Sequence, residues 1–244
     1  MRQFKTEELG SGYIVAVSSE HTFGTDAVLL ADFASPNKKD IVCDMGTGCG
    51  IIPMLLCRNG MGKHITGIEI QQNGYEQATQ SVELSNARDK VEIINGDIRN
   101  IKQLLEHGTF NVVIMNPPYK AANGGIESRE ASARIARHEI TCNIDDVTAA
   151  AAHLLNFGGR LCLCNRPERL TDTIVSMRNA GIEPKRLRFV SKKADTAPWL
   201  FMIEGKKGAK PFMNVEAPLV MYNSDGELCD EVIKIYGEYK ENHK

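Results

Sequence analysis

Residues 41–56 read IVCDMGTGCGIIPMLL and are the most informative part of this 244-residue chain. The segment begins as an apolar run, passes through Asp44 into glycines at 46, 48 and 50, and continues as an apolar segment of helical length. Glycine suits a turn that needs a positive φ or brings a ligand against the backbone. A helix that starts at such a turn directs free N–H groups and a partial positive charge toward the turn. The segment therefore predicts a strand, a ligand-binding turn and a helix.

The alternation of strand-like and helix-like segments continues along most of the chain. It predicts an α/β fold with a mostly parallel, doubly wound sheet, helices on both faces and an antiparallel edge. The expected strands are residues 41–44, 64–70, 91–95, 112–115, 160–164, 184–190 and 199–204. The expected helices are residues 51–58, 74–86, 101–105, 144–155 and 169–180.

Composition excludes several classes of protein. The chain is 42% hydrophobic and 25% charged with a formal net charge of −2, which is typical of a globular protein and not of a disordered one. No segment reaches the roughly 18 uncharged apolar residues of a membrane-spanning helix, and charges occupy the N-terminus where a signal peptide would be apolar. We therefore expect a cytoplasmic location. The seven cysteines form no CxxC pair, so we expect reduced thiols and no metal site.

The three glycines of the turn do not have the GxGxxG spacing of dinucleotide-binding folds, in which the third glycine lies one residue further on. DxGxGxG instead resembles the S-adenosylmethionine (SAM) loop of Rossmann-like methyltransferases. That resemblance implies that the methionine end of SAM is held by Asp44 and by the backbone of the turn, namely Gly46, Thr47, Gly48 and Gly50. A purely structural tight turn is the alternative.

Acidic residues also mark the ends of the next two predicted strands. Glu69 stands 25 positions after Asp44, and an acid there can accept hydrogen bonds from both ribose hydroxyls. Ile70 beside it and Asn116, which follows the fourth predicted strand, are further expected cofactor contacts. Asp97 is placed to accept a hydrogen bond from the exocyclic amine of an adenine, and Ile98 to pack on its ring. As isolated residues such acids are more often helix caps or solvated strand ends. Their order behind the glycine turn favours cofactor binding.

The fourth predicted strand runs directly into Asn116-Pro117-Pro118-Tyr119. Because the two prolines remove N–H donors and restrict the backbone, the nearby carbonyls point in fixed directions. The side-chain oxygen of Asn116 and the carbonyl of Pro117 can each accept one hydrogen of a planar amine, while Tyr119 stacks on its ring. Holding both hydrogens directs the nitrogen lone pair toward the methyl group of a sulfonium. Transfer of that methyl group to the nitrogen needs no metal. A Pro-Pro stop after a strand is the structural alternative.

NPPY behind a SAM loop resembles the amino-methyltransferases that modify adenine exocyclic nitrogen or the glutamine side-chain amide. Both substrates present a planar NH2, so the motif leaves the choice open. Residues 21–30, HTFGTDAVLL, are similar to the FxTDAxLL segment of bacterial tRNA(Val) adenine-N6 methyltransferases and their methyltransferase-small-domain relatives. There the segment folds over the SAM pocket, which implies that Phe23, Thr25 and Asp26 lie near the methionine moiety or the entering base. A capped helix is the alternative.

This resemblance covers about residues 12–204. Glutamine methyltransferases carry a helical domain of several tens of residues before the NPPY core, whereas about 40 residues precede Asp44 here, which disfavours them. A DNA adenine methyltransferase and a SAM- or RNA-binding module without turnover are further alternatives. Asn116 and Tyr119 argue against a non-enzymatic module, because neither is needed to bind the cofactor. Arg137 and His138 are given no catalytic role, since methylation of an amine needs no strong base.

Charge is distributed unevenly along the chain. Residues 166–210 contain 11 Lys and Arg against 5 Asp and Glu, while the parts before and after are net acidic. Clustered basic residues favour contacts with RNA phosphates, although a solvated surface is the alternative. The candidate RNA contacts are Arg186, Arg188, Lys192, Lys193, Lys206 and Lys207, with Lys210.

The sequence divides into three parts. Residues 1–40 are expected to fold over the cofactor pocket, residues 41–210 to form the SAM-dependent methyltransferase core, and residues 211–244 to form a C-terminal extension. The extension departs from the family pattern and looks like an added hairpin and helix. Together the motifs predict a SAM-dependent methyltransferase that acts on the N6 amine of an adenine in structured RNA, with tRNA as the expected partner.

Overall fold

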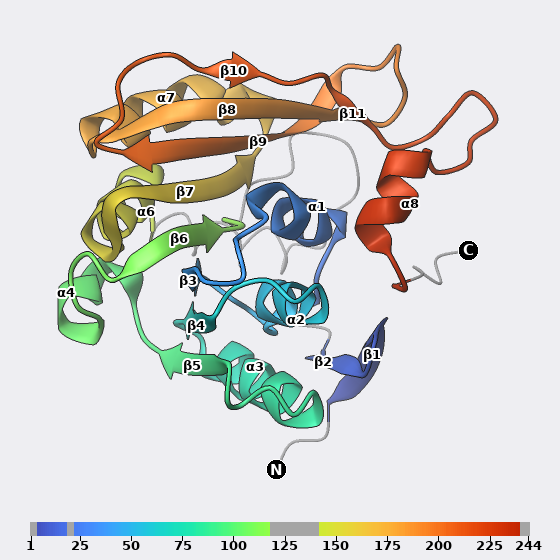
Figure 1. Cartoon of the computed structure of the whole chain (residues 1–244). Helices are drawn as coiled ribbons and strands as arrows, with labels where there is room; N and C mark the ends of the chain where they lie inside the picture. Colours follow the sequence, from blue (N-terminus) through green and yellow to red (C-terminus); the bar gives the residue numbers. More distant parts are fainter. Residues whose placement is uncertain (1–3, 19–21, 118–141, 240–244) are drawn as a thin grey trace, which may run out of the picture.

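The computed structural model describes residues 4–18, 22–117 and 142–239. One large sheet forms its centre (Figure 1). Its strands are β3 (Ile41–Met45), β4 (His64–Glu69), β5 (Val91–Asn95), β6 (Phe110–Met115), β7 (Leu155–Asn165), β8 (Ile182–Ser191), β9 (Pro198–Lys207), β10 (Asn214–Val215) and β11 (Leu219–Val220). The strand order is β10-β8-β9-β7-β6-β3-β4-β5, and β11 pairs with β8 as well.

The pairing confirms the predicted fold class. Strand β9 runs antiparallel to β7 and β8, whereas the pairs on the other side of β7 are all parallel. Since β8 is antiparallel to β9, it points in the same direction as β7. The carboxyl ends of β3, β4, β5, β6, β7 and β8 therefore lie at one edge of the sheet, which we call the carboxyl edge.

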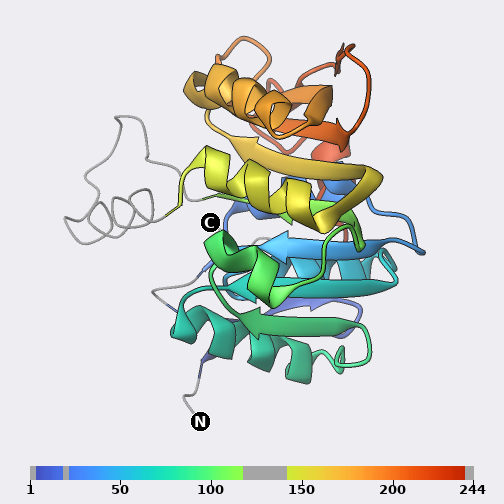
Figure 2. The ribbon, with the colours of Figure 1, turned by 90° about the vertical axis from the view of Figure 1, so that its left-hand side faces the viewer.

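Helices cover both faces of the sheet (Figure 1). One face is covered by α1 (Thr25–Ala34), α2 (Ile51–Arg58) and α3 (Gln72–Leu84). The other face, seen from the front in Figure 2, is covered by α4 (Ile101–Leu104), α6 (Ile144–Leu154) and α7 (Leu170–Asn179). Two short 3-10 turns, η1 (Ile98–Asn100) and η2 (Pro167–Arg169), precede α4 and α7.

The side chains of β6 show how the sheet separates two apolar cores. Val112 and Ile114 pack toward α1 and α2, while Val113 and Met115 pack toward α6. Successive side chains of a strand point to opposite faces, so the part of a central strand that has helices on both sides is apolar at consecutive positions. This requirement is why residues 112–115 form an uninterrupted apolar run in the sequence.

Strand β7 starts earlier than predicted. The sequence predicts a turn at Gly158-Gly159 and a strand from residue 160, but β7 already begins at Leu155. The pairing register with β6 shifts between Phe110 and Val112, and Gly158 adopts a φ of +80° there. The glycines thus allow an irregularity within the strand, which extends pairing instead of ending it.

Both termini add elements that the sequence did not predict. An antiparallel pair, β1 (Lys5–Gly10) and β2 (Tyr13–Val17), lies apart from the large sheet and packs on α3. The C-terminal extension contains the expected helix as α8 (Asp230–Tyr236), and an antiparallel bridge between Tyr222 and Leu228 closes a short hairpin-like turn before it. The strands β10 and β11, which the sequence did not predict, each pair in parallel with β8. No helix among the described residues is both long and apolar enough to cross a membrane.

Candidate active site

The register of four strands brings the predicted motifs together at the carboxyl edge. Met45 near the end of β3 pairs with Ile68 of β4 on one side and with Met115 of β6 on the other. The next residues along these strands are Gly46, Glu69 and Asn116. Gly46 begins the glycine turn, Glu69 is the acid at the end of β4, and Asn116 begins the NPPY motif. The chain order also reverses here, since β4 and β5 lie on one side of β3 and β6 on the other. Open α/β sheets bind ligands at such a switch point.

The glycine turn is fastened to the end of β4 by backbone hydrogen bonds. The amides of Gly46 and Thr47 both donate to the carbonyl of Ile68, at 2.8 and 3.0 Å. The Gly48 amide donates to Oε2 of Glu69 at 2.9 Å, and Gln71 N donates to Oε1 at 2.8 Å. Glu69 therefore fixes the turn, and each of its carboxylate oxygens keeps a lone pair for another donor.

Asp44 lies buried beneath this turn with 1% of its surface exposed. Burial raises the pKa of Asp44 to about 7, the negative charge of Glu69 adds to the rise, and the adjacent Thr47 hydroxyl lowers it in part. Among the described residues, Asp44 Oδ2 and Thr47 Oγ1 lack a partner with hydrogen-bond geometry. Such atoms are costly to leave unpaired, so the pocket is suited to a ligand that brings a cation or hydrogen-bond donors.

The backbone of Gly48 leaves room for a ligand directly above the turn. Its φ is +56°, a conformation that favours glycine, and a Cβ built there would meet no described atom within 4 Å beyond its chain neighbours. Gly50 differs, because a Cβ there would lie 3.3 Å from the Cα of Ala78 in α3. Gly50 therefore serves packing, whereas Gly48 borders open space. Together with the unpaired atoms of Asp44 and Thr47, this opening fits SAM.

Asn116 is held by two neighbouring elements. The thiol of Cys164, at the end of β7, donates to Asn116 Oδ1 at 3.1 Å. Asp26, in the first turn of α1, forms a hydrogen bond with the Asn116 side chain. Burial raises the pKa of Asp26, and hydrogen bonds with the Ala27 amide and Asn116 offset part of that rise. No local pattern in the sequence indicates this contact for Cys164, which reads as an ordinary core thiol.

The predicted N-terminal segment contacts the C-terminal extension. Tyr236 of α8 donates its hydroxyl hydrogen to Thr25 Oγ1 at 3.1 Å. The ring of Phe23 lies 5.7 Å from that of Tyr239, which in turn stacks on Tyr236 at 6.0 Å. Arg58 joins the two termini further, because its Nη1 donates to the carbonyls of Leu9 and Tyr236 at 3.0 Å.

The residues predicted to contact adenine are arranged differently from the expectation. Asp97 accepts a hydrogen bond from Arg99 N and forms an ion pair with the Arg99 guanidinium, which lowers the pKa of Asp97. Ile98 is 8% exposed and packs in the core toward α6, so it offers little surface to a ring. Ile70 is 45% exposed beside Glu69 and is the more open apolar contact.

The NPPY motif is described in part. Asn116 and Pro117 follow directly from β6. Pro118 and Tyr119 lie outside the described residues, as do Arg137 and His138.

Three predicted RNA contacts are engaged within the protein instead. Arg186 donates to the Phe33 carbonyl and to Glu204 and Glu216, and its guanidinium lies 3.9 Å from the Phe33 ring centroid. Arg188 forms a bidentate pair with Glu231 of α8, at 2.8 and 2.9 Å. Lys207 Nζ donates to the carbonyls of Ala152 and Leu155, where α6 ends. These side chains join elements of the fold, and a contact of any of them with phosphate stays a prediction.

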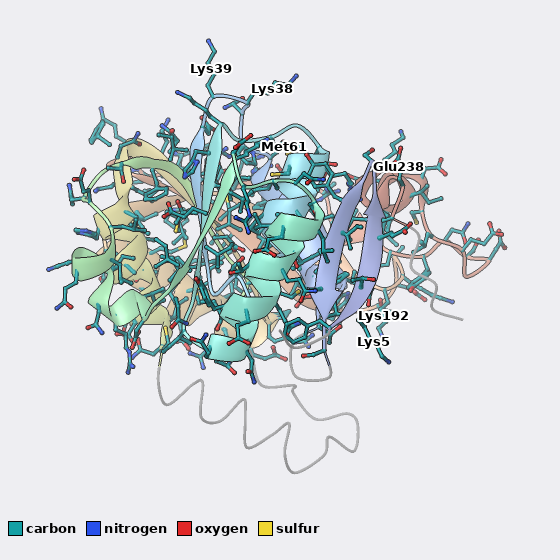
Figure 3. The ribbon with its side chains drawn as sticks, turned by 90° about the horizontal axis from the view of Figure 1, so that it is seen from below. Lys5, Lys38, Lys39, Met61, Lys192 and Glu238 are labelled. Atoms are coloured by element: carbon teal, nitrogen blue, oxygen red, sulfur yellow. The ribbon has the colours of Figure 1, made fainter. Side chains whose placement is uncertain are left out.

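The remaining lysines lie at opposite edges of the sheet. Lys192 and Lys193 follow β8 and are exposed at the carboxyl edge, whereas Lys206 lies near the end of the antiparallel β9, toward the opposite edge. Figure 3 shows Lys192 on the side opposite Lys38 and Lys39, which precede β3. The predicted basic segment therefore does not form one surface. Of the candidate RNA contacts, Lys192 and Lys193 lie at the same edge as the candidate site.

Comparison with known proteins agrees with this arrangement. The family model for the methyltransferase small domain matches residues 15–174. The chain belongs to the methyltransferase small domain family. A protein of Porphyromonas gingivalis named tRNA1(Val) (adenine(37)-N6)-methyltransferase is 30% identical over 194 residues, covering 71% of this chain and 75% of the relative. A relative with the same name from Mannheimia succiniciproducens is 28% identical, covering 88% and 86%.

The fold comparison leads to the same family of folds. The crystal structure of a predicted O-methyltransferase from Agrobacterium tumefaciens superposes with a TM-score of 0.71 at 20% identity, covering 87% of this chain and 95% of that one. The predictions of a methyltransferase fold, of a methyltransferase and of SAM as its cofactor are thereby confirmed. Among the described residues, no three His, Cys, Asp or Glu side chains are grouped so that they could hold a metal ion.

Proposed function

We propose that this protein transfers a methyl group from SAM to the exocyclic N6 amine of an adenine in tRNA. The observation that carries the proposal is the pairing of Met45 with Met115, which sets Asn116 directly beside the glycine turn. Adjacent strands are about 4.8 Å apart, so a methyl donor above the turn and an amine at Asn116 are neighbours. The names of the relatives from P. gingivalis and M. succiniciproducens support adenine in tRNA as the substrate.

The residues around the turn are suited to hold SAM in one orientation. Asp44 and the backbone of the turn face the methionine end, Glu69 accepts from the ribose hydroxyls, and Ile70 and Asp97 lie toward the adenine. SAM supplies the methyl group on a positively charged sulfur, which is a good leaving group. We propose that Phe23 and Thr25 border this region, and that residues 1–40 cover the pocket and are held there by the C-terminal extension.

Asn116 and Pro117 act on the acceptor. The Asn116 side-chain oxygen and the Pro117 carbonyl each accept one hydrogen of the target amine, which orients the nitrogen lone pair toward the methyl group. Stacking of Tyr119 on the base stays a prediction from the sequence, and so does the role of Pro118. A base in a folded RNA must be splayed out to reach Asn116, at least cost where it is already unpaired. A cytoplasmic location fits this substrate.

Replacing Gly48 with alanine should weaken SAM binding while the protein stays folded. The new Cβ would enter the open space above the turn, and we expect at least about a tenfold rise in Kd, equal to about 1.4 kcal/mol. Isothermal titration calorimetry measures this. Gly60→Ala is the matched control, since Gly60 has a φ of +66° and the same open surroundings but lies beyond α2. Equal SAM affinity of the two variants would remove Gly48 from the cofactor site.

Reversing the charges of Lys192 and Lys193 to glutamate should weaken tRNA binding at least about tenfold. Each lost phosphate contact also lowers the slope of log K against log salt by about 1, so the slope should fall by about 2. Filter binding at several salt concentrations measures both. Lys206→Glu with Lys210→Glu makes the same change in net charge away from the carboxyl edge and should have little effect. An unaltered slope in the first variant would contradict its contact with phosphates.

The substrate is tested directly by incubating the purified protein and methyl-labelled SAM separately with tRNA, rRNA, DNA and protein. We expect label in tRNA, recovered as N6-methyladenosine after digestion to nucleosides. Label recovered as N6-methyladenine from DNA, or as methylglutamine from protein, would replace the proposed substrate by one of the alternatives that the NPPY motif allows.

A further inference from the structure

We propose that Asp26 is a positioning residue that fixes the side-chain amide of Asn116 with its oxygen toward the target amine. The inference rests on the proposed function of Asn116 as the acceptor for that amine. The sequence predicts only that Asp26 lies near the pocket, and the inference adds that Asp26 acts through Asn116.

Three elements meet at the Asn116 side chain. Asp26 belongs to the first turn of α1, Asn116 follows β6, and Cys164 lies near the end of β7. The Cys164 thiol donates to Oδ1 at 3.1 Å, and Asp26 forms a hydrogen bond with the same side chain. Burial keeps the pKa of Cys164 well above its usual value, and the negative charge of Asp26 adds to this, so the thiol remains a donor.

The chemistry of the two partners selects one orientation of the amide. The hydrogen bond with Asn116 lowers the pKa of Asp26, which is the effect of a donor on a carboxylate, so Asp26 faces Nδ2 of Asn116. A thiol donates, so Cys164 must face Oδ1. Both partners therefore favour the same rotamer, and Oδ1 keeps a second lone pair for a hydrogen of the substrate. The flipped amide would present its own N–H groups to the substrate amine, and two facing donors cannot form a hydrogen bond.

Asp26 also has a structural role, and the test must distinguish that role from the positioning of Asn116. Its Oδ1 accepts from Ala27 N at 3.0 Å in the first turn of α1, and a negative charge is favourable at a helix N-terminus. Asp26→Asn keeps an acceptor for the Ala27 amide but offers Asn116 either an oxygen or an NH2. The variant therefore removes the selection of one orientation while it retains most of the capping.

We expect Asp26→Asn to lower kcat at least about tenfold while the KM for tRNA and the Kd for SAM stay within about twofold. Cys164→Ala should lower kcat less, and Cys164→Ser, which restores a donor, should recover most of the loss. Asp32→Asn is the matched control, because Asp32 lies on α1 away from Asn116 and its pKa is likewise raised by burial. Its kcat should equal that of the wild type.

A second readout needs neither SAM nor activity. The side-chain ¹⁵N resonance of Asn116, assigned by its loss in Asn116→Ala, should shift or broaden in Asp26→Asn and stay unchanged in Asp32→Asn. An unchanged resonance together with a wild-type kcat would overturn the inference. A fall in thermal stability and SAM affinity at constant kcat would also overturn it, because Asp26 would then act only as a helix cap. Failure of the wild-type protein to methylate adenine would reject the proposed function, yet the resonance would still decide whether Asp26 orients Asn116.

Discussion

Replacing Asn116 with alanine is expected to lower the single-turnover rate of methyl transfer about 100- to 1,000-fold, the usual cost of removing one aligned hydrogen-bonding group from an active site. The loss corresponds to about 3–4 kcal/mol of transition-state stabilisation. The affinity for SAM should change by less than about threefold, because we expect Asp44, the glycine turn and Glu69 to hold most of the cofactor. Rapid-quench kinetics with labelled SAM and tRNA, together with calorimetry, measure both quantities.

Asn111→Ala is the matched control for this experiment. Asn111 lies on the same strand, β6, but at its other end, where Oδ1 accepts from Ile41 N at 2.8 Å. Its loss should lower thermal stability without changing the transfer rate. A wild-type rate in Asn116→Ala, or equal rate losses in the two variants, would show that Asn116 does not hold the amine.

Replacing Glu204 with glutamine is expected to destabilise the fold by about 2–3 kcal/mol. Glu204 Oε2 accepts from Arg160 at 2.6 Å and from Arg186 at 3.1 Å, so two guanidinium groups share one carboxylate. Breaking a buried ion pair costs about 3–5 kcal/mol, and we expect slightly less because both arginines keep other partners. These partners include the Ala34 carbonyl for Arg160 and Glu216 for Arg186.

Thermal unfolding measures this effect. For a chain of this length the expected loss lowers Tm by about 5–10 °C. Glu231→Gln is the control, since Glu231 pairs with Arg188 but is 55% exposed, and exposed pairs contribute about 0–1 kcal/mol. If Glu204→Gln and Glu231→Gln shift Tm by the same small amount, the ion pairs of Glu204 with Arg160 and Arg186 do not stabilise the fold as expected.

The parallel core of the fold is predictable from the sequence for a physical reason. Strands buried on both faces must be apolar at consecutive positions, so β3 and β6 stand out in the sequence between helical segments. The glycine turn is equally visible, because a positive φ such as that of Gly48 favours a residue without a side chain. Since parallel strands end at one edge, the sequence alone is enough to expect Glu69 and Asn116 near this turn.

The assignments that depend on distant partners cannot be read from local sequence. Arg186 and Arg188 stand in a basic segment, but their partners Phe33 and Glu231 are far away along the chain. The folded sheet brings each arginine to its partner, and a count of charges along the sequence does not reveal these contacts. The same is true of Cys164, whose thiol reaches Asn116 because β7 is the neighbour of β6.

The C-terminal extension shows a similar limit. Its residues near α8 read as an acidic, tyrosine-containing tail, and nothing in that pattern indicates that Tyr236 reaches Thr25 or that Tyr239 packs on Phe23. Tyr239 also donates to Glu7 of β1 at 3.1 Å, so the extension contacts β1 as well as the segment with Phe23 and Thr25. Tyr236 and Tyr239 therefore contact the N-terminal segment that is proposed to cover the cofactor.

A crystal structure with bound S-adenosylhomocysteine tests most directly whether a methyl donor at the glycine turn faces Asn116. We expect the ligand to lie across the ends of β3 and β4, with its ribose hydroxyls on Glu69 and its sulfur facing the side chain of Asn116. A ligand bound elsewhere, or one whose sulfur faces away from Asn116, would contradict it.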